Sequence, residues 1–417
     1  MPHTRQPPLD PASILATATS DPEWLATLSQ SPLPRGFEYG SDPIEAITMM
    51  KQVVKATYPQ RRAAVSASKP ADVTEAEVIV PIPATKLVPT PAKNRVIICH
   101  PTLPSSEDRT GNTNGASWPV ILLFHGGGHC LGYPEMELPL ARLLVQTHQA
   151  VVILPSYRLA PEHSFPATFN DGFETLKQIA HDTVNLSANA SPSLPSTLNV
   201  LPQALTGYID VNKGFILGGT SAGSTISASI SHLYNNHRTT NPHLHLPPLT
   251  ALFLSCGTCL SPRCVPSTYT PYYLSYEQNK DCPPLDRSFH NMLRAASKAD
   301  LTSPIMVSLD QQPDLNRPSP ATDHTWLKDG HVKVYFQACG QDISRDDTLI
   351  YERMLREEVG VETRLDLYAG FGHCFWAIPR IYAEMEMTKA RTRHSVEGIG
   401  WLLRREVDSQ DTEVGSN

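Results

Sequence analysis

Short apolar runs recur along the chain, and each is bounded by Gly, Pro or polar residues. Their lengths suit buried β-strands and are too short for helices that cross a membrane. The runs occupy residues 76–82, 95–100, 119–124, 151–154, 214–218, 251–255, 332–338 and 363–368. A series of separated strands of this kind predicts a central β-sheet.

Segments with apolar residues at helical spacing lie before and between these runs. Asp21 and Asp42 are suitable N-cap residues for two of them, and each is followed by Pro at the first helical position. The helical segments are residues 22–28, 43–54, 165–180, 289–299 and 349–359. Strands that alternate with helices predict an α/β fold, with a mostly parallel central sheet flanked by helices.

Composition along the chain suggests how this fold is divided. Residues 1–20 are rich in Pro, Ser and Thr and predict a mobile N-terminal tail, and residues 186–206 read as an inserted surface loop. Residues 21–60 predict a helical cap segment, and the proline-rich residues 257–330 predict an excursion that completes the cap. The core then comprises residues 61–256 and 331–408.

Five aromatic residues of the excursion allow two interpretations. Either they line an apolar pocket under the cap, or they pack the cap onto the body. They are Tyr269, Tyr272, Tyr273, Tyr276 and Trp326.

Ser221 stands between Gly219 and Gly223 in a Gly-x-Ser-x-Gly pattern, directly after an apolar run. A strand that turns sharply into a helix needs small residues on both flanks, and the turn exposes the serine hydroxyl. The helix N-terminus also offers backbone N–H groups that stabilise developing negative charge. The pattern predicts a nucleophile at Ser221. By itself it also fits a structural turn or a phosphate-binding loop.

A second glycine-rich segment, His125-Gly126-Gly127-Gly128-His129, follows the strand at 119–124. Bare N–H groups at the carboxyl end of a buried strand can form an oxyanion hole, and a flexible turn is the plain alternative. His125 and His129 are four residues apart, but the glycines between them disfavour a helix. The sequence therefore predicts no metal site here.

An acid and a histidine follow the last two predicted strands. Asp342 comes just after the strand at 332–338, and His373 comes just after the strand at 363–368. The chain order Ser, Asp, His is the order used by the nucleophile-elbow fold. Asp346 and Asp347 are rival acids, but Asp342 follows the strand most closely.

Bulk properties exclude several classes of function. The 417 residues carry a formal net charge of −7 without a basic block, which argues against a nucleic-acid partner. The eight Cys do not suggest a disulfide framework. Cys256, Cys259 and Cys264 lack the second clustered pair typical of zinc sites. We expect no metal, no other cofactor, no membrane span and no secretory signal, and hence a cytoplasmic protein.

Together these motifs resemble the hormone-sensitive-lipase-like branch of the α/β-hydrolase superfamily, particularly its fungal esterase-like members. The resemblance covers residues 76 to 405 and rests on the His125–Gly128 segment, residues 157–163, the Ser221 motif, the Asp342 loop and residues 372–375. It implies that Ser221 is the nucleophile, Asp342 the acid and His373 the base. It also implies an oxyanion hole made by the N–H groups of Gly127, Gly128 and Ala222, with His125 and Gly126 as part of the motif.

Residues near the expected site differ from the family pattern. Asp usually precedes the nucleophile and an aromatic residue usually follows the three glycines, where this chain has Thr220 and His129. Ser224 and Ile343-Ser344 are further departures. No catalytic group is lost, so these differences bear on substrate preference. Arg158 and Glu162 are expected to brace the site, and His163 is expected to be structural.

The resulting hypothesis is a serine carboxylesterase that cleaves a small-molecule ester or lactone. Extension to secondary metabolites rests only on the fungal resemblance. A dehydratase, a cyclase or a transacylase on the same scaffold is the alternative. A ligand receptor is disfavoured, because plant receptors with this fold lack the catalytic histidine and this chain has His373. The expected partner is an ester substrate, and a homodimer is left open.

Overall fold

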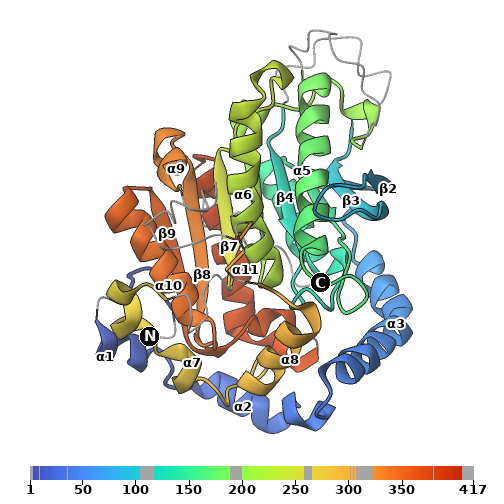
Figure 1. The fold of residues 1–417 in the computed structure, drawn as a ribbon. Coiled ribbons are helices and arrows are strands. Elements are labelled where there is room, and N and C mark those ends of the chain that lie inside the picture. Colours follow the sequence, from blue (N-terminus) through green and yellow to red (C-terminus); the bar gives the residue numbers. More distant parts are fainter. Residues whose placement is uncertain are drawn as a thin grey trace.

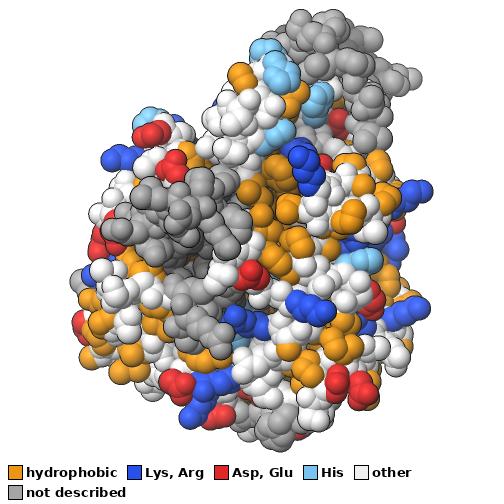
Figure 2. All heavy atoms as spheres, viewed as in Figure 1, with side chains coloured by type: hydrophobic (Ala, Val, Ile, Leu, Met, Phe, Trp, Pro, Cys, Tyr) orange, Lys and Arg blue, Asp and Glu red, His pale blue; other side chains and the backbone are white. Residues whose placement is uncertain are grey.

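The computed structural model describes residues 3–405, apart from residues 9, 35, 104–116, 188–199, 258–264, 301, 304, 307–322 and 379. Cys259, Cys264 and most of the loop predicted at 186–206 lie outside the described residues. Within the described part, no helix is long and apolar enough to cross a membrane. On the face drawn in Figure 2, basic and acidic side chains are interspersed.

A single sheet contains the nine strands of the described residues, in the order β1-β9-β8-β7-β6-β4-β5-β3-β2. Strands β5 to β9 pair in parallel through β4, β6, β7 and β8, whereas β1, β2 and β3 join antiparallel at the two edges. The strands are β1 (His3–Thr4), β2 (Val73–Ile82), β3 (Ala92–Pro101), β4 (Val120–Phe124), β5 (Val151–Pro155), β6 (Phe215–Thr220), β7 (Ala251–Ser255), β8 (Lys333–Gln341) and β9 (Thr363–Gly372). The predicted α/β class is confirmed.

Helices cover both faces of this sheet (Figure 1). They are α1 (Pro11–Ala16), α2 (Pro22–Gln30), α3 (Pro43–Ala67), α4 (Leu138–His148), α5 (Ala167–Leu186), α6 (Ala222–Thr240), α7 (Ser275–Gln278), α8 (Arg287–Ser297), α9 (Thr325–Asp329), α10 (Arg345–Arg353) and α11 (Glu386–Leu402). A π-helical turn, Met354–Val359, continues α10.

Side chains of the central strands alternate between two cores, as the period of two in a strand requires. Leu122 and Phe124 of β4 pack with α5 and α6 on one face. Ile121 and Leu123 pack with α4 and α11 on the other. Because both faces are buried, the strands read in the sequence as continuous apolar runs.

Helices from both segments assigned to a cap lie against each other. Ile47 of α3 shares a buried cluster with Leu293 of α8 and with Leu285, just before α8. In Figure 1, helices α1, α2, α7 and α8 gather at one end of the sheet. The division into cap and core stays a prediction.

Residues 3–20 differ from the predicted mobile tail. His3 and Thr4 pair with Tyr368 and Leu367 of β9, so they extend the sheet at its edge. Asp10 caps α1 through a hydrogen bond from the Ser13 N–H, and Ile14 is buried. A short edge strand and a six-residue helix have too little periodicity to be recognised in a proline-rich sequence.

The expected bracing role of Arg158 has a clear structural basis. Its guanidinium donates to both carboxylate oxygens of Asp171 in α5, at 2.7 to 3.1 Å, and Nη1 donates to the carbonyl oxygen of Thr90. Asp171 is fully buried. Glu162, by contrast, forms an exposed ion pair with Lys51 of α3.

We therefore expect Asp171→Ala to lower the free energy of unfolding by about 3–5 kcal/mol, because Arg158 would be left as a buried, unpaired cation. Glu162→Ala is the matched control and should cost at most about 1 kcal/mol, as for other exposed ion pairs. Urea denaturation followed by circular dichroism measures both. Equal losses in the two variants would contradict the assignment.

Candidate active site

Ser221 lies in a sharp turn between β6 and α6. Its backbone has φ 55° and ψ −118°, a conformation that costs a non-glycine residue free energy. The turn is held by hydrogen bonds from the Ser221 N–H to the Ser255 carbonyl at 2.7 Å, and from the Thr225 N–H to the Ser221 carbonyl at 3.1 Å. Strain of this kind is typical of functional residues.

The glycines of the motif are required by close backbone approach. A Cβ atom at Gly223 would lie 2.0 Å from the carbonyl oxygen of Phe124, and one at Gly219 would lie 2.5 Å from the same atom. Both distances are far inside van der Waals contact. The end of β4 is thus packed directly against the turn that carries Ser221.

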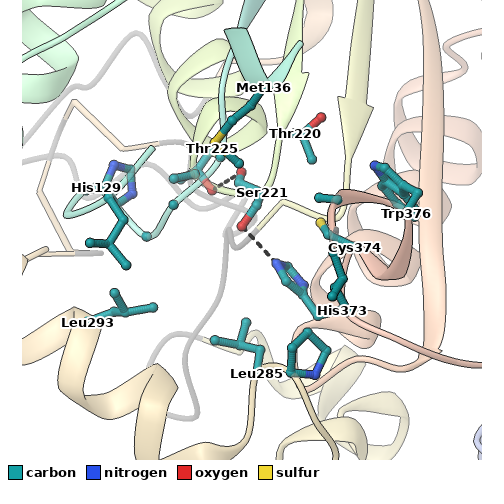
Figure 3. Close-up of a pocket in the computed structure, with 18 of the residues that line it drawn as sticks. His129, Met136, Thr220, Ser221, Thr225, Leu285, Leu293, His373, Cys374 and Trp376 are labelled. Carbon is teal, nitrogen blue, oxygen red and sulfur yellow. Dashed lines mark hydrogen bonds between the residues drawn. The ribbon is translucent and has the colours of Figure 1, made fainter. Parts of the chain in front are cut away.

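Three predicted residues form one continuous hydrogen-bonded chain. His373 Nε2 lies 2.9 Å from Ser221 Oγ, and His373 Nδ1 lies 2.6 Å from Asp342 Oδ2 (Figure 3 shows the first of these contacts). Because the carboxylate only accepts, Nδ1 carries the proton, and Nε2 of the neutral ring is left to accept from the serine hydroxyl.

Asp342 is oriented by its own set of donors. Its other oxygen, Oδ1, accepts from the backbone N–H and the hydroxyl of Ser344, both at 2.8 Å. The rival Asp346 instead pairs with Arg345 and accepts from the N–H groups of Leu274 and Ser275. The geometry therefore places Asp342, and not Asp346, against His373.

In this hydrogen-bonded chain, the interactions between His373 and Asp342 shift their pKa values in the direction opposite to the effect of burial. Burial lowers the pKa of His373, but the charge of Asp342 and its hydrogen bond outweigh burial and raise it above the usual value of 6.5. Burial raises the pKa of Asp342, but His373 and the Ser344 donors reverse this and keep it low. Asp342 is thus ionised, and it stabilises the protonated form of the imidazole.

If His373 acts as a base, kcat/KM for an ester should fall as the pH drops through the His373 pKa, because only the neutral ring accepts a proton. The acidic limb should have an apparent pKa above about 6.5. Asp342→Asn should move that limb to lower pH, since burial then acts unopposed. The pH profile of residual activity, or the ring resonances of His373 by NMR, measures this shift. If the acidic limb of Asp342→Asn has the same apparent pKa as that of the wild type, Asp342 does not raise the pKa of His373.

The glycine-rich segment after β4 lies beside Ser221. Gly127 and Gly128 have φ values of 121° and 59°, which suit glycine. Within the described residues, the N–H groups of Gly127, Gly128 and Ala222 donate to no protein acceptor. All three residues line the same pocket as Ser221, so these donors are free to meet a bound group.

His125 stabilises the conformation of this glycine-rich segment. Its Nδ1–H donates to the Gly126 carbonyl at 2.7 Å, and its ring stacks on Tyr157 at 4.3 Å. The Tyr157 hydroxyl donates to the His125 carbonyl at 2.7 Å. Burial lowers the pKa of His125 to about 4, so the ring is neutral. His125 therefore acts on the loop conformation rather than on a ligand.

Ser221 and His373 open into a pocket of about 450 Å³. His129 and Thr220, the two departures singled out from the sequence, both line it (Figure 3). Leu285, Phe289 and Leu293, from α8 and the residues before it, form an apolar wall. Predicted cap residues thus contribute to the pocket.

The five aromatic residues of the excursion do not line this pocket. Tyr269, Tyr272, Tyr273 and Trp326 pack against the main core, and Tyr276 packs against the α3–α8 cluster. These side chains therefore pack between elements of the fold, which excludes the pocket-lining interpretation, while the division into cap and body stays a prediction.

Sequence reasoning missed the opposite wall. Trp376, Ala377 and Ile378 follow His373, and Thr388, Arg391 and Thr392 come from α11. Glu137 and Leu140, at the start of α4, also line the pocket. Neither α4 nor α11 was predicted, although the apolar spacing within residues 138–148 could have revealed α4.

Buried thiol groups lie close to the His373 side chain. Cys256 Sγ lies 3.6 Å from Cys339 Sγ, and one ligand atom each from Cys256, His373 and Cys374 lie within 4.8 Å of one another. This is the only such group among the described residues. A soft metal ion held there would compete with Ser221 and Asp342 for His373, so metal binding would disrupt the hydrogen bonds of His373.

The sheet order, the turn at Ser221 and the histidine and acid after the last two strands are those of an α/β-hydrolase. Residues 121–377 match the family described as alpha/beta hydrolase fold, and the chain belongs to it. Within that family it is a carboxylesterase-type enzyme of the hormone-sensitive-lipase-like branch.

Two individual relatives and one solved structure are similar to this chain. An AB hydrolase superfamily protein of Schizosaccharomyces pombe is 26% identical over 287 residues, which are 68% of this chain and 71% of the relative. Versiconal hemiacetal acetate esterase of Dothistroma septosporum is 27% identical over 286 residues, 68% of this chain and 74% of the relative. The crystal structure of vibralactone cyclase is similar in fold, with a TM-score of 0.68 at 21% identity, over 96% of this chain and 98% of that one.

Proposed function

We propose that this enzyme hydrolyses a small-molecule carboxylic ester or lactone through an acyl-enzyme on Ser221. The observation that carries the proposal is the unbroken chain from Asp342 through His373 to Ser221, at the floor of a largely apolar pocket. A nucleophile, a base and a group that orients the base within hydrogen-bond reach are the signature of covalent catalysis.

Acylation begins when Ser221 Oγ attacks the ester carbonyl while His373 Nε2 takes its proton. The bond to the alcohol breaks, and His373 returns the proton to the leaving alkoxide. Asp342 fixes the Nδ1–H tautomer and stabilises the imidazolium. Water then attacks the acyl-enzyme with His373 again as base, which releases the acid and restores Ser221.

Negative charge develops on the carbonyl oxygen in both steps. We assign its stabilisation to the N–H groups of Gly127, Gly128 and Ala222, which have no protein acceptor in the described chain and line the pocket. Each such donor is worth roughly a hundredfold to a thousandfold in rate. His125 and Gly126 support the loop.

Two observations support a small-molecule ester as the substrate. The pocket volume of about 450 Å³ suits a small molecule. One relative, from Dothistroma septosporum, is named versiconal hemiacetal acetate esterase. We therefore extend the proposal to esters of secondary metabolites. A cytoplasmic location and a homodimer stay predictions from the sequence.

Pre-steady-state kinetics with 4-nitrophenyl butanoate tests the acyl-enzyme. We expect a burst of nitrophenol that matches the enzyme concentration, with Ser221→Ala inactive. Ser231→Ala is the matched control, since this buried serine of α6 only bonds back to the Ala228 carbonyl. Steady-state turnover by Ser221→Ala at the wild-type rate would refute the role of Ser221.

A second function deserves a direct test, because a cyclase shares this fold. The same His373 and N–H donors could serve proton transfer, or pass the acyl group to an alcohol in place of water. Such an enzyme should form an adduct at Ser221 with reactive esters but turn over slowly in water. Faster release when an alcohol is added would favour the transacylase.

A further inference from the structure

The pocket has two walls of different chemistry. In Figure 3, His129 and Leu293 lie on one side of Ser221, and Thr220 and Trp376 lie on the other. The side that carries Leu293 is apolar. The other side holds buried polar groups that the proposed hydrolysis does not use.

Glu137 is the first of these groups. It is only 7% exposed and lines the pocket, at the N-cap of α4, yet its carboxyl makes no capping hydrogen bond to that helix. Burial raises the pKa of Glu137, although the charge of Arg391 and the hydroxyl of Thr220 act in the opposite direction. A buried carboxyl without a fixed ionic contact is costly unless a ligand uses it.

Arg391 of α11 supplies a donor to the same region. Its guanidinium lies 3.9 Å from the centre of the Trp376 ring, and its Nε and Nη2 donate to Gln337 Oε1 at 3.1 and 2.9 Å. Within the described residues, these contacts leave Nη1 without a bonded acceptor. Arg391 is 4% exposed, so this cation is held in place by its neighbours.

Thr220 completes the group beside the nucleophile. It is 4% exposed, and its hydroxyl oxygen has no hydrogen bond of ordinary geometry among the described residues. The hydroxyl lies close enough to Glu137 to affect its ionisation. A buried hydroxyl that lines a pocket without an ordinary hydrogen bond is costly in a protein that does not use it.

We propose that Glu137, Thr220 and Arg391 form a polar subsite that recognises a hydroxyl group on the ester substrate. The inference rests on the proposed esterase function and assigns its specificity. Glu137 accepts from the substrate hydroxyl, Arg391 or Thr220 donates to it, and Trp376 packs against the carbon skeleton beside it.

The charge balance selects a neutral group. A carboxylate or phosphate in this subsite would face Glu137, and an ammonium group would face Arg391. A hydroxyl both donates and accepts, so it satisfies both residues at once. A site built to bond a hydroxyl also rejects the analogue that lacks it, because its own polar groups are then left unpaired.

Matched esters test the subsite. One pair differs in the acyl part, 4-nitrophenyl butanoate and 4-nitrophenyl 3-hydroxybutanoate. The other differs in the alcohol part, 2-naphthyl butanoate and 7-hydroxy-2-naphthyl butanoate. In at least one pair, we expect the hydroxylated ester to have a kcat/KM about 10- to 100-fold higher, the range for a hydrogen bond to a charged group.

Glu137→Gln and Thr220→Val should each reduce this ratio by about tenfold, because each removes one hydrogen-bonding contribution. Glu162→Gln, the same chemical change at an exposed position outside the pocket, should preserve the ratio. If these residues had a purely structural role, each substitution would lower kcat/KM equally for both esters of a pair. Ratios near one in the wild type, or ratios that both pocket variants leave intact, would overturn the proposal.

Binding measurements on an inactive variant separate recognition of the substrate hydroxyl from catalysis. Calorimetric titration of Ser221→Ala with the same esters should give the same preference in Kd, and Glu137→Gln in that background should remove it. Preference in binding without any burst in the wild type would contradict the esterase and retain the subsite. A burst with equal Kd values within each pair would retain the esterase and overturn the subsite.

Discussion

Replacing His373 by alanine should lower kcat for 4-nitrophenyl butanoate on the order of a millionfold, the scale found when a base that acts together with its nucleophile is removed. Among the described residues, His373 is the one side chain that hydrogen-bonds to both Ser221 and Asp342. Without it, Ser221 has no acceptor for its proton. Stopped-flow and long-time assays of the purified variant measure the loss.

The loss of kcat should differ between the members of the hydrogen-bonded chain from Asp342 to Ser221. Asp342→Asn should cost on the order of ten-thousandfold, because the amide can donate to Nδ1 and favour the wrong tautomer. Combining it with His373→Ala should add little further loss. His243→Ala, at an exposed histidine, is the control and should keep full activity. Losses below a hundredfold in His373→Ala would contradict its role as the base.

Gly223→Ala should damage both stability and activity. The new methyl group would lie 2.0 Å from the Phe124 carbonyl oxygen and 2.7 Å from that of His125, so the turn must separate from the end of β4. Overpacking of this kind costs about 1–3 kcal/mol or more. A displacement of Ser221 by about 1 Å would lower the rate by roughly a hundredfold.

Gly207→Ala separates this clash from backbone strain. Gly207 has φ +82°, and a Cβ there would meet nothing within 4 Å. This control should lose about 1 kcal/mol of stability through its conformation alone and keep its activity. Thermal unfolding and ester assays on both variants decide the matter. If Gly223→Ala retains wild-type stability and rate, the close packing of β4 against the turn is not needed.

The sequence located the central strands because burial on both faces makes them continuous apolar runs. The strand at 251–255 has the same bounds in the structure, and β4 differs by one residue from the run at 119–124. Helix α3 was predicted to end near residue 54 but continues to Ala67, through Pro59. Its interior proline and largely exposed surface remove the signals on which a boundary depends.

Candidate chemistry was predictable where backbone geometry restricts the residue type. Gly219, Ser221 and Gly223 follow from a turn with no room for side chains, and the chain order of Asp342 and His373 follows from the strands that precede them. Only part of the polar wall was predictable. Thr220 was singled out because it precedes the nucleophile, but Glu137 and Arg391 join it only through the tertiary packing of α4, β6 and α11, and no local pattern relates them.

Covalent labelling tests the central claim most directly. The protein is incubated with a fluorophosphonate, digested, and mapped by mass spectrometry, beside Ser221→Ala and the control Ser231→Ala. We predict one adduct per chain, on the peptide that contains Ser221, with labelling lost in Ser221→Ala and kept in Ser231→Ala. An unlabelled wild-type protein, or an adduct that persists in Ser221→Ala, would contradict a nucleophile activated by His373 and Asp342.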